Sequence, residues 1–260
     1  MSNTTSAMGP QVSEPQVSII VPFYNSSATL AACIESLLAQ ETGVAYEILL
    51  VDNRSSDDSA TIAARYDGVT LLHESTPGAY AARNTGIQQA QASVIAFTDA
   101  DCTPDPDWLS TILDGLSDPN VAVLLGHCRY PDDASLTLRL LAAYENAKTA
   151  YVLGHRDPAY RFAYCNNMAV RASVFAELGP FLTWQRAADS ELVHRLATRS
   201  PELRTVYRPA MRINHLEFRR FRDRARRLQL YTDTNSKIAT FRELSLGQRL
   251  AVLAHAVFGR

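Results

Sequence analysis

The sequence has few cysteines, and none of them stands in a metal-binding pair. The four cysteines are widely spaced and form no C-x-x-C motif, which argues against a zinc cluster. This usage favours a reduced compartment, in which a cysteine acts as a small buried apolar residue. The cysteines are Cys33, Cys102, Cys128 and Cys165.

Long apolar runs are missing as well. No window reaches the roughly 20 apolar residues of a membrane-spanning helix, and residues 1–15 lack the basic start and the apolar run of a signal peptide. We therefore expect a cytoplasmic protein whose residues 1–15 are disordered. With 260 residues, 47% of them hydrophobic, the chain is long enough for one large domain or for one domain with an appendage.

Charge is low overall but unevenly distributed. The net charge is −2, yet residues 204–260 carry 13 Lys and Arg against 4 Asp and Glu, whereas residues 1–203 carry 12 against 23. Residues 218–260 are expected to form a basic amphipathic helical extension, which either contacts the inner face of a membrane or packs on the acidic body. Nucleic acid is not expected as a partner, because no recognisable module surrounds the arginines. The apolar stripe of this extension is Phe218, Phe221, Ala225, Leu228 and Tyr231.

Two nucleotide-binding glycine motifs are absent. No G-x-G-x-x-G follows the first apolar run, and G-x-x-x-x-G-K-[ST] occurs nowhere, which disfavours a dinucleotide-binding dehydrogenase and a P-loop NTPase. Short apolar runs instead alternate with helical patterns over short connections, which predicts βαβ units in a doubly wound parallel sheet. The expected strands are Val17–Phe23, Glu47–Asp52, Val69–Leu72, Val94–Thr98, Val121–Leu125 and a last strand over Thr205–Tyr207, and one of the expected helices is Val193–Ala197.

Three of these strands end in residues that can bind a ligand, at Pro22 and Tyr24, at Asp52, and at Asp99 and Asp101. Unpaired carboxylates cannot be buried inside a strand, so the acids must emerge at the carboxyl edge of the sheet, where open α/β sheets hold ligands. Two carboxylates at i and i+2 point the same way from an extended backbone and can hold Mg²⁺ or Mn²⁺ beside a substrate phosphate. We name Asp99–Asp101 the triplet. Taken alone, the triplet could also be a solvated loop with two surface acids.

The ordered set of motifs resembles glycosyltransferase family 2, whose members have the GT-A fold. The resemblance covers about residues 16–220. It implies an α/β fold with a doubly wound, mainly parallel Rossmann-like sheet flanked by helices, and a helical C-terminal extension. The nucleotide-sugar half would be residues 16–125 and the acceptor half residues 126–217. The motifs are Val17–Asn25, Ile48–Asp52 with the Ser55–Asp57 turn, Pro77–Gly86 with Arg83 and Asn84, and Asp99–Asp101.

The resemblance also implies a role for each strand end in binding a nucleotide sugar. Tyr24 would stack near the base, Asp52 would hydrogen-bond the base, and Arg83 would lie by the diphosphate. Asp99 and Asp101 would bind the ribose and the divalent ion, and Pro22 would also belong to the nucleotide-sugar site. Two plainer interpretations remain open: Tyr24 as an aromatic residue of a turn, and Arg83 as a solvated helix residue paired with Glu74. The sequence has Asn53 where many members have a second Asp, which leaves the preferred base and sugar open.

Three further residues are candidates in the acceptor half. The family has a Glu-Asp-x-Asp/Glu motif whose Asp is the catalytic base, and here its first Glu is Ala188. Asp189 is therefore the candidate base and Glu191 the second choice, with helix capping as the alternative role of Asp189. Some GT-A enzymes bring a late His onto the metal, so His215 is a candidate ligand; the alternative is a surface or capping histidine.

The sequence thus predicts an inverting glycosyltransferase that depends on Mn²⁺ or Mg²⁺. It would move one sugar from a UDP-, GDP- or dTDP-linked donor to an acceptor hydroxyl on a glycan, a lipid-linked molecule or a small molecule. Two alternatives stay open: a nucleotidyltransferase of similar fold, and a non-catalytic nucleotide- or carbohydrate-binding module, which the loss of Glu at Ala188 would favour.

Overall fold

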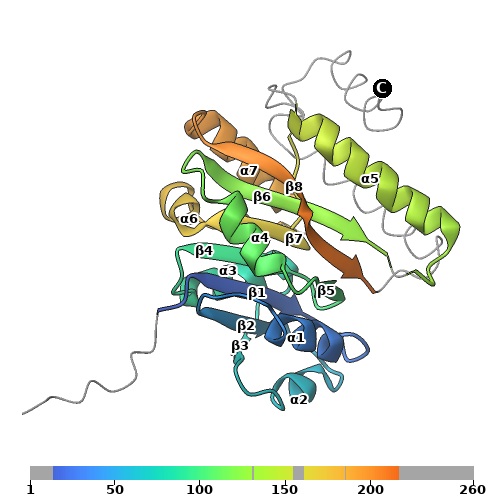
Figure 1. Ribbon diagram of the computed structural model, residues 1–260. Helices are drawn as coiled ribbons and strands as arrows, with labels where there is room; N and C mark the ends of the chain where they lie inside the picture. The colour runs from blue at the N-terminus through green and yellow to red at the C-terminus, as the bar shows by residue number, and fades with distance from the viewer. Residues whose placement is uncertain (1–13, 131, 155–160, 185, 217–260) are drawn as a thin grey trace, which may run out of the picture.

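The protein, described by a computed structural model over residues 14–130, 132–154, 161–184 and 186–216, is built on one sheet. Within these residues eight strands follow the order β3-β2-β1-β4-β7-β6-β8-β5 (Figure 1). The strands are β1 (Val17–Phe23), β2 (Tyr46–Asp52), β3 (Thr70–His73), β4 (Val94–Thr98), β5 (Cys102–Pro104), β6 (Val121–Arg129), β7 (Asn167–Arg171) and β8 (Arg204–His215). The helices are α1 (Leu30–Leu38), α2 (Ser59–Ala63), α3 (Ala79–Gln89), α4 (Trp108–Gly115), α5 (Leu136–Gly154), α6 (Ala172–Leu178) and α7 (Ala188–Arg199).

The first half of the sheet is parallel. β1 pairs with β2 on one side and with β4 on the other, and β3 pairs with β2. Because successive side chains of a strand point to opposite faces, Ile19 and Val21 enter the core under α1 and α4, whereas Ile20 enters the core under α3, α6 and α7. Both faces are covered, which explains why these strands are apolar almost throughout. The doubly wound parallel arrangement expected from the sequence is confirmed here.

The second half of the sheet is mixed. β7 lies between β4 and β6 and runs antiparallel to both, β8 is parallel to β6, and β5 is antiparallel to β8. At this end of the molecule α5 lies beside β6 and β8 (Figure 1). The sheet is therefore mainly parallel, as expected, with β7 reversed in its middle and β5 reversed at its edge. An apolar run specifies a buried strand but not its direction, so the reversal of β7 was not evident from the sequence.

The buried amide of Asn167 fastens the mixed half from within. Its Nδ2 donates to the carbonyls of His127 and Met211 at 3.1 and 2.9 Å, and its Oδ1 accepts from Trp108 Nε1 at 2.9 Å. These bonds join β7 to β6, β8 and α4. Gly126 lies so close that a Cβ there would overlap the Asn167 amide and the Met211 carbonyl, so this approach of the backbone requires glycine.

Two element boundaries near the candidate site differ from the expected ones, and one strand was not expected. The last strand was expected only over Thr205–Tyr207 but extends to His215, so this histidine stands on β8 and not after it. Helix α7 was expected from Val193 but begins at Ala188. Strand β5 was not expected, because a three-residue strand is specified mainly by its partner, and that partner is far along the chain.

Two expected segments fall largely or wholly outside the described residues: the disordered N-terminus, apart from residues 14 and 15, and the basic extension over 218–260. In the part of the chain that the structure describes, no helix is long and apolar enough to cross a membrane. All four cysteines are free thiols, and three of them are buried, as their spacing indicated.

Candidate active site

The carboxyl ends of β1 and β2 form the first part of the candidate site. Pro22 is buried within β1, whereas Tyr24, just beyond its end, is 61% exposed. Asp52 ends β2 and is buried, with its Oδ1 accepting from the Ser55 N–H at 2.9 Å and its Oδ2 3.4 Å from His73 Nδ1. Because the two strands pair in parallel up to these residues, the exposed ring and the buried carboxylate come to one edge of the sheet.

Asn53 holds the loop that leads into α3. Its Nδ2 donates to the carbonyls of Glu74 and Thr76 at 3.0 and 2.7 Å, and its Oδ1 accepts from the Gly78 N–H at 2.7 Å. A carboxylate could not donate the first two bonds. The amide at this position is therefore explained by the loop that it ties down.

Arg83 is buried on α3 and pairs with Asp99. Its Nη2 lies 2.5 Å from Asp99 Oδ1, and the side chains are 6% and 35% exposed. Its guanidinium carbon also lies 5.3 Å from the centroid of the Tyr80 ring. The interpretation of Arg83 as a solvated partner of Glu74 is wrong, because Glu74 accepts from Thr85 and the backbone of residue 76 instead.

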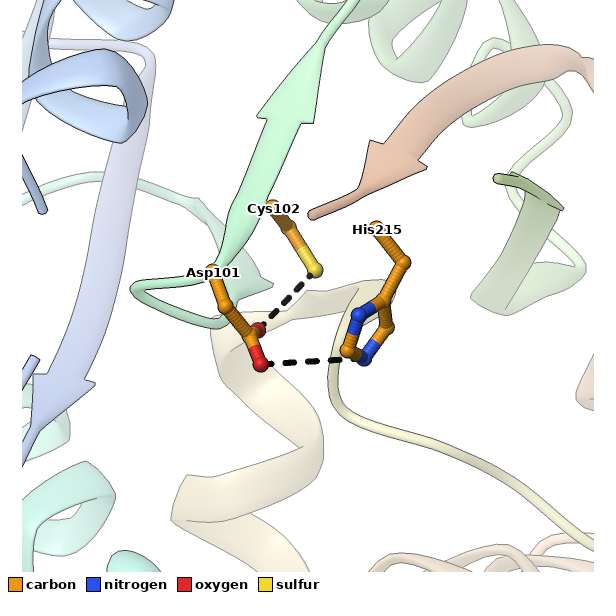
Figure 2. A group of neighbouring side chains, drawn as sticks. All are labelled: Asp101, Cys102 and His215. Atoms are coloured by element: carbon orange, nitrogen blue, oxygen red, sulfur yellow. Dashed lines mark hydrogen bonds and ion pairs between the residues drawn. The ribbon is translucent and has the colours of Figure 1, made fainter. Parts of the chain in front are cut away.

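The second acid of the triplet faces a different set of groups. Asp101 Oδ2 lies 3.8 Å from His215 Nε2, and Cys102 Sγ lies 3.5 Å from Asp101 Oδ1. One donor atom from each of the three residues lies within 4.8 Å of the others. Figure 2 shows the three side chains converging from the start of β5 and the end of β8. A carboxylate oxygen and an imidazole nitrogen are donors that suit a divalent ion such as Mn²⁺, and a sulfur suits softer transition metals.

The two carboxylates therefore diverge, although an extended backbone would have pointed them the same way. The chain turns at Ala100 and Asp101 before β5 begins, and the Cys102 N–H donates to the Asp99 carbonyl at 3.0 Å. The turn leaves Asp99 with Arg83 and directs Asp101 towards His215. Within the described residues Asp99 is not part of the three-donor group.

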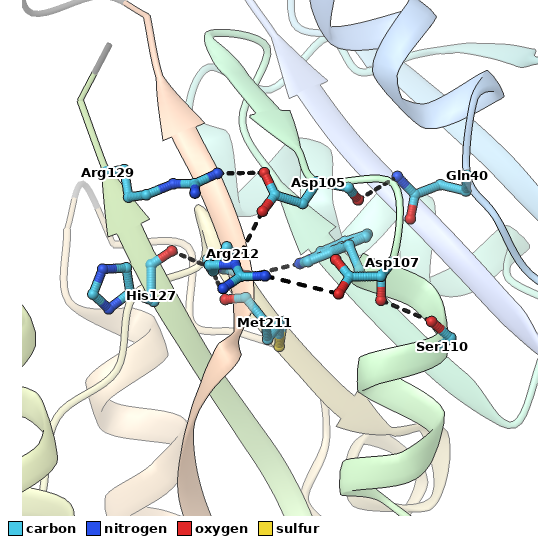
Figure 3. A network of polar contacts seen from close by, with 10 residues as sticks. Gln40, Asp105, Asp107, Ser110, His127, Arg129, Met211 and Arg212 are labelled. Carbon is cyan, nitrogen blue, oxygen red and sulfur yellow. Dashed lines mark hydrogen bonds and ion pairs between the residues drawn. The ribbon is translucent and has the colours of Figure 1, made fainter. Parts of the chain in front are cut away.

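A salt-bridge network holds β5 against β8 next to this group (Figure 3). Asp105 pairs with Arg129 of β6 and, at 3.0 Å, with Arg212 Nε of β8. Its N–H donates to the Arg212 carbonyl at 3.0 Å, and its carbonyl accepts from Gln40 Nε2 at 2.9 Å. We name Asp105, Arg129 and Arg212 the clamp. No local sequence pattern could have found it, because its members come from three separate elements.

The candidate base, Asp189, lies in the first turn of α7. Ala187, with φ of 66°, is the N-cap residue, so the capping role considered for Asp189 is wrong. Its Oδ1 accepts from the Ser190 N–H at 2.8 Å and its Oδ2 from the Cys165 N–H at 3.2 Å. The Tyr80 hydroxyl also favours the charged form of this carboxylate and so lowers its pKa.

Burial raises the pKa of Asp189 above the usual range of an aspartate, and the hydrogen bond from the Ser190 N–H and the charge of Arg83 oppose this shift. A raised pKa brings a carboxylate closer to the value that suits a general base near neutral pH. Burial likewise raises the pKa of Cys102, with the charges of Asp101 and Asp99 as further causes, so the thiol is neutral when no cation is bound.

Glu191 stands one position further along α7 in the motif and has a different environment. Its Oε2 accepts from Arg195 Nη2 at 2.9 Å, and Arg195 Nη1 donates to the Leu178 carbonyl at 2.5 Å. Glu191 is thus held by an arginine that also anchors the end of α6. These contacts make Asp189 the better candidate for the base.

Two residues near these groups were not singled out from the sequence. Cys102 directly follows Asp101 and could have been noticed as a third donor, but its proximity to His215 depends on the unexpected pairing of β5 with β8. Tyr80 lies on α3, and its ring centroid is 5.5 Å from that of Phe181. Its side chain is only 6% exposed, and a buried tyrosine hydroxyl usually has a polar partner. The sequence does not show that this tyrosine is buried.

Known proteins share sequence and fold with this chain. The model of the family described as glycosyl transferase family 2 matches residues 18–179. Glycosyltransferase AglE of Haloferax volcanii is 33% identical over 175 residues, which are 64% of this chain and 56% of AglE. The pre-mycofactocin glycosyltransferase of Mycobacterium tuberculosis is 28% identical over 241 residues, which are 87% of this chain and 48% of that protein. The chain thus spans about half the length of these relatives.

Solved structures show the same fold. The mannosyltransferase PcManGT of Pyrobaculum calidifontis, in complex with GDP-Man and Mn²⁺, has a TM-score of 0.68 at 21% identity, covering 95% of this chain and 71% of that chain. The glucosyl-3-phosphoglycerate synthase of Mycobacterium tuberculosis, in complex with Mn²⁺, UDP and phosphoglyceric acid, has a TM-score of 0.62 at 18% identity, covering 86% of this chain and 79% of that chain. With a family match over more than half of its residues and this shared architecture, the chain belongs to glycosyl transferase family 2 and has a GT-A fold.

Proposed function

We propose that this protein transfers one sugar, with inversion, from a nucleotide-diphosphate sugar to an acceptor hydroxyl, and that it needs Mn²⁺ or Mg²⁺. The observation that carries the proposal is the position of Asp189. This buried carboxylate lies close enough to Arg83 for the two charges to interact, and Arg83 pairs with Asp99 at the edge where the donor strands end. A candidate base and a candidate donor site therefore share one surface.

The donor would lie along the strand ends. Tyr24 offers an exposed ring to the base, Asp52 a buried carboxylate to its N–H groups, and Asp99 a partly exposed oxygen to the ribose. Asp101 and His215 would hold the divalent ion. When bound, such an ion stabilises the negative charge that develops on the leaving diphosphate.

The chemical step needs a proton acceptor on the acceptor side. Asp189 takes the proton of the acceptor hydroxyl, the oxygen forms a bond to the anomeric carbon, and the bond from that carbon to the diphosphate oxygen breaks. The nucleoside diphosphate leaves with the electron pair. Attack from the face opposite the leaving group inverts the anomeric configuration. The hydrogen bonds from the Ser190 and Cys165 N–H groups orient the carboxylate for this transfer.

Relatives of known structure support the donor class. The structures similar to this chain include one with GDP-Man and Mn²⁺, one with UDP and Mn²⁺, and one with UDP-GlcNAc. We therefore place UDP- and GDP-sugars first, with dTDP-sugars third. The acceptor would carry its hydroxyl on a glycan, a lipid-linked molecule or a small molecule.

A donor panel tests the proposal. The full chain is incubated with UDP-, GDP- and dTDP-sugars, with Mn²⁺, Mg²⁺ or EDTA, and with a panel of acceptor alcohols, and the released nucleotide is identified by chromatography. We expect a nucleoside diphosphate and a glycosylated acceptor, and no product with EDTA. Release of pyrophosphate would instead indicate a nucleotidyltransferase. Saturable binding of a nucleotide sugar without turnover across the panel would indicate a binding module.

The basic extension is part of the proposal. Residues 217–260 lie outside the described residues, so the support is the excess of Arg in the sequence. We propose peripheral contact with anionic membranes on the cytoplasmic side. Flotation with vesicles that contain phosphatidylglycerol should recover the full chain but not a chain ending at residue 217, and equal recovery of both would contradict this contact.

A further inference from the structure

The thiol of Cys102 lies beside the two groups that would hold the metal, and nothing in the proposed transfer requires it there. Its Sγ is 3.5 Å from Asp101 Oδ1, and its donor atom lies within 4.8 Å of those of Asp101 and His215. We propose that Cys102 Sγ is a third protein ligand of the divalent ion, and that the site therefore favours soft cations over Mg²⁺. The inference rests on the proposed function, which already puts a divalent ion at Asp101 and His215.

The backbone holds these donors together. Cys102 and His215 are directly opposed in the antiparallel pair of β5 and β8. Directly opposed residues of an antiparallel pair project from the same face, with Cβ atoms about 5 Å apart. The Leu216 N–H donates to the Asp101 carbonyl at 2.7 Å, which fixes the turn that carries the acid. The convergence therefore follows from strand pairing and not from the chance position of flexible side chains.

The exposure of the three side chains suits an ion that also binds a substrate. Cys102 is fully buried, whereas the side chains of His215 and Asp101 are 11% and 19% exposed. Protein donors would cover the inner side of the ion and leave its outer side to the diphosphate and water. An incomplete shell of this kind is typical of metal sites that bind substrate.

The chemical consequence concerns which metal binds. Mg²⁺ prefers six oxygen ligands in a regular octahedron and gains little from sulfur. Cobalt, zinc and cadmium ions form stronger bonds to thiolate, so a sulfur ligand shifts the relative affinities in their favour. A serine at this position keeps the size of the side chain but removes the sulfur, so Cys102→Ser should lose this preference.

The test is metal binding to the full chain in the absence of donor and acceptor. Co²⁺ is titrated while the near-ultraviolet absorption is recorded, because a thiolate bound to Co²⁺ produces a sulfur-to-cobalt charge-transfer band. Calorimetry with Cd²⁺ and with Mg²⁺ supplies the affinities. We expect the band in the native protein and its loss in Cys102→Ser. The same substitution should lower the Cd²⁺ affinity by at least about 10-fold and change the Mg²⁺ affinity by about 2-fold at most.

Two matched controls separate this thiol from the others. Cys33 is also buried, but its Sγ lies 3.5 Å from the Asp99 carbonyl and is not in the three-donor group, so Cys33→Ser should keep the band. Asp101→Asn should weaken the binding of every metal. The spectrum of the native protein is informative even if Cys102→Ser fails to fold.

The outcomes distinguish this inference from the proposed function. Co²⁺ binding that depends on Asp101 but gives no charge-transfer band would overturn the thiol ligand and leave the proposed metal site in place. A band that survives Cys102→Ser but not Cys33→Ser would also overturn it. If no divalent ion binds to the native protein, with or without a nucleoside diphosphate, both proposals fail.

Discussion

The parallel half of the sheet and the mixed half bring their site residues together in different ways. In the parallel half, a side chain at a strand end contacts a turn at the same edge of the sheet: Asp52 accepts from residue 55, and Asn53 holds residues 74–78, which follow the neighbouring strand β3. In the mixed half the important contacts join residues that are distant in sequence. Asp101 meets His215 and Asp105 meets Arg212, and each pair is more than 100 residues apart.

This difference indicates which substitutions should affect only neighbouring residues and which should affect distant ones. A substitution at the end of β1 or β2 should disturb one turn and one ligand contact. A substitution in the mixed half should act through strand pairing and reach groups that it does not touch. Four experiments sharpen or break this comparison.

The largest effect is expected for Asp189→Asn. Losing the base should lower the transfer rate by about 1,000-fold or more, whereas Glu191→Gln should keep most of the activity. Burial raises the pKa of Asp189 above its unfolded value, so the folded chain holds that proton more strongly and stability falls as pH rises through this range. Asn removes this buried charge but cannot accept from both the Ser190 and the Cys165 N–H groups, so the two effects oppose each other and the melting temperature should change by about 2 °C at most.

Steady-state assays and thermal melts at neutral pH check both parts. For the native enzyme, kcat/KM should fall on the acid side at a higher pH than an ordinary aspartate would give. Near-native turnover by Asp189→Asn would show that another group is the base.

The next largest effect is expected for Gly126→Ala in the mixed half. The added methyl would overlap the Asn167 amide and the Met211 carbonyl, so the bonds that join β6, β7 and β8 must shift. Overpacking and the disturbed hydrogen bonds should together lower the free energy of unfolding by about 3 kcal/mol. Gly43→Ala is the matched control in the parallel half, because nothing lies within 4 Å of its added Cβ. Urea denaturation measures both variants, and equal stabilities would mean that β6 and β7 repack freely.

The third comparison separates the two acids of the triplet. Asp99→Asn leaves the buried guanidinium of Arg83 without its carboxylate and should lower the free energy of unfolding by about 2 kcal/mol, less than for a fully buried pair because Asp99 is one-third exposed. Asp101→Asn should change stability little and lose most of the Mn²⁺ affinity. Denaturation and calorimetry on the two variants give the answer, and the reverse pattern would exchange the roles of the two residues.

The smallest effect concerns the clamp. Asp105→Ala removes the carboxylate that joins Arg129 to Arg212 without touching a metal donor. Looser pairing of β5 with β8 should weaken Mn²⁺ binding by about 10-fold, or about 1.4 kcal/mol. Asp107→Ala is the control, because its carboxylate is half exposed and lies 3.9 Å from Arg212 Nη2. Calorimetric affinities within a factor of two for both variants would mean that the clamp does not orient the site.

Sequence patterns alone were sufficient to predict the strands of the parallel half and their direction. Apolar runs closed by Pro22, Asp52 and Asp99 require buried strands whose polar residues emerge at one edge, and the helical segments between these runs require the strands to be parallel. The order of the motifs then identified the family. The partner of Arg83 was not predictable in the same way, since Glu74 and Asp99 are both acids within reach along the chain, and only packing chose between them.

Tertiary structure decided which strands and which side chains are neighbours in the mixed half. The direction of β7, the length of β8 and the existence of β5 depend on pairings between distant segments, which local periodicity does not encode. The same pairings turned Asp101 away from Asp99 and towards Cys102 and His215. Residue types along the chain determine which groups can bind a nucleotide or a metal, because their chemistry is local. Whether they share a site depends on strand pairing across the whole sheet, because only the folded backbone brings residues 102 and 215 face to face.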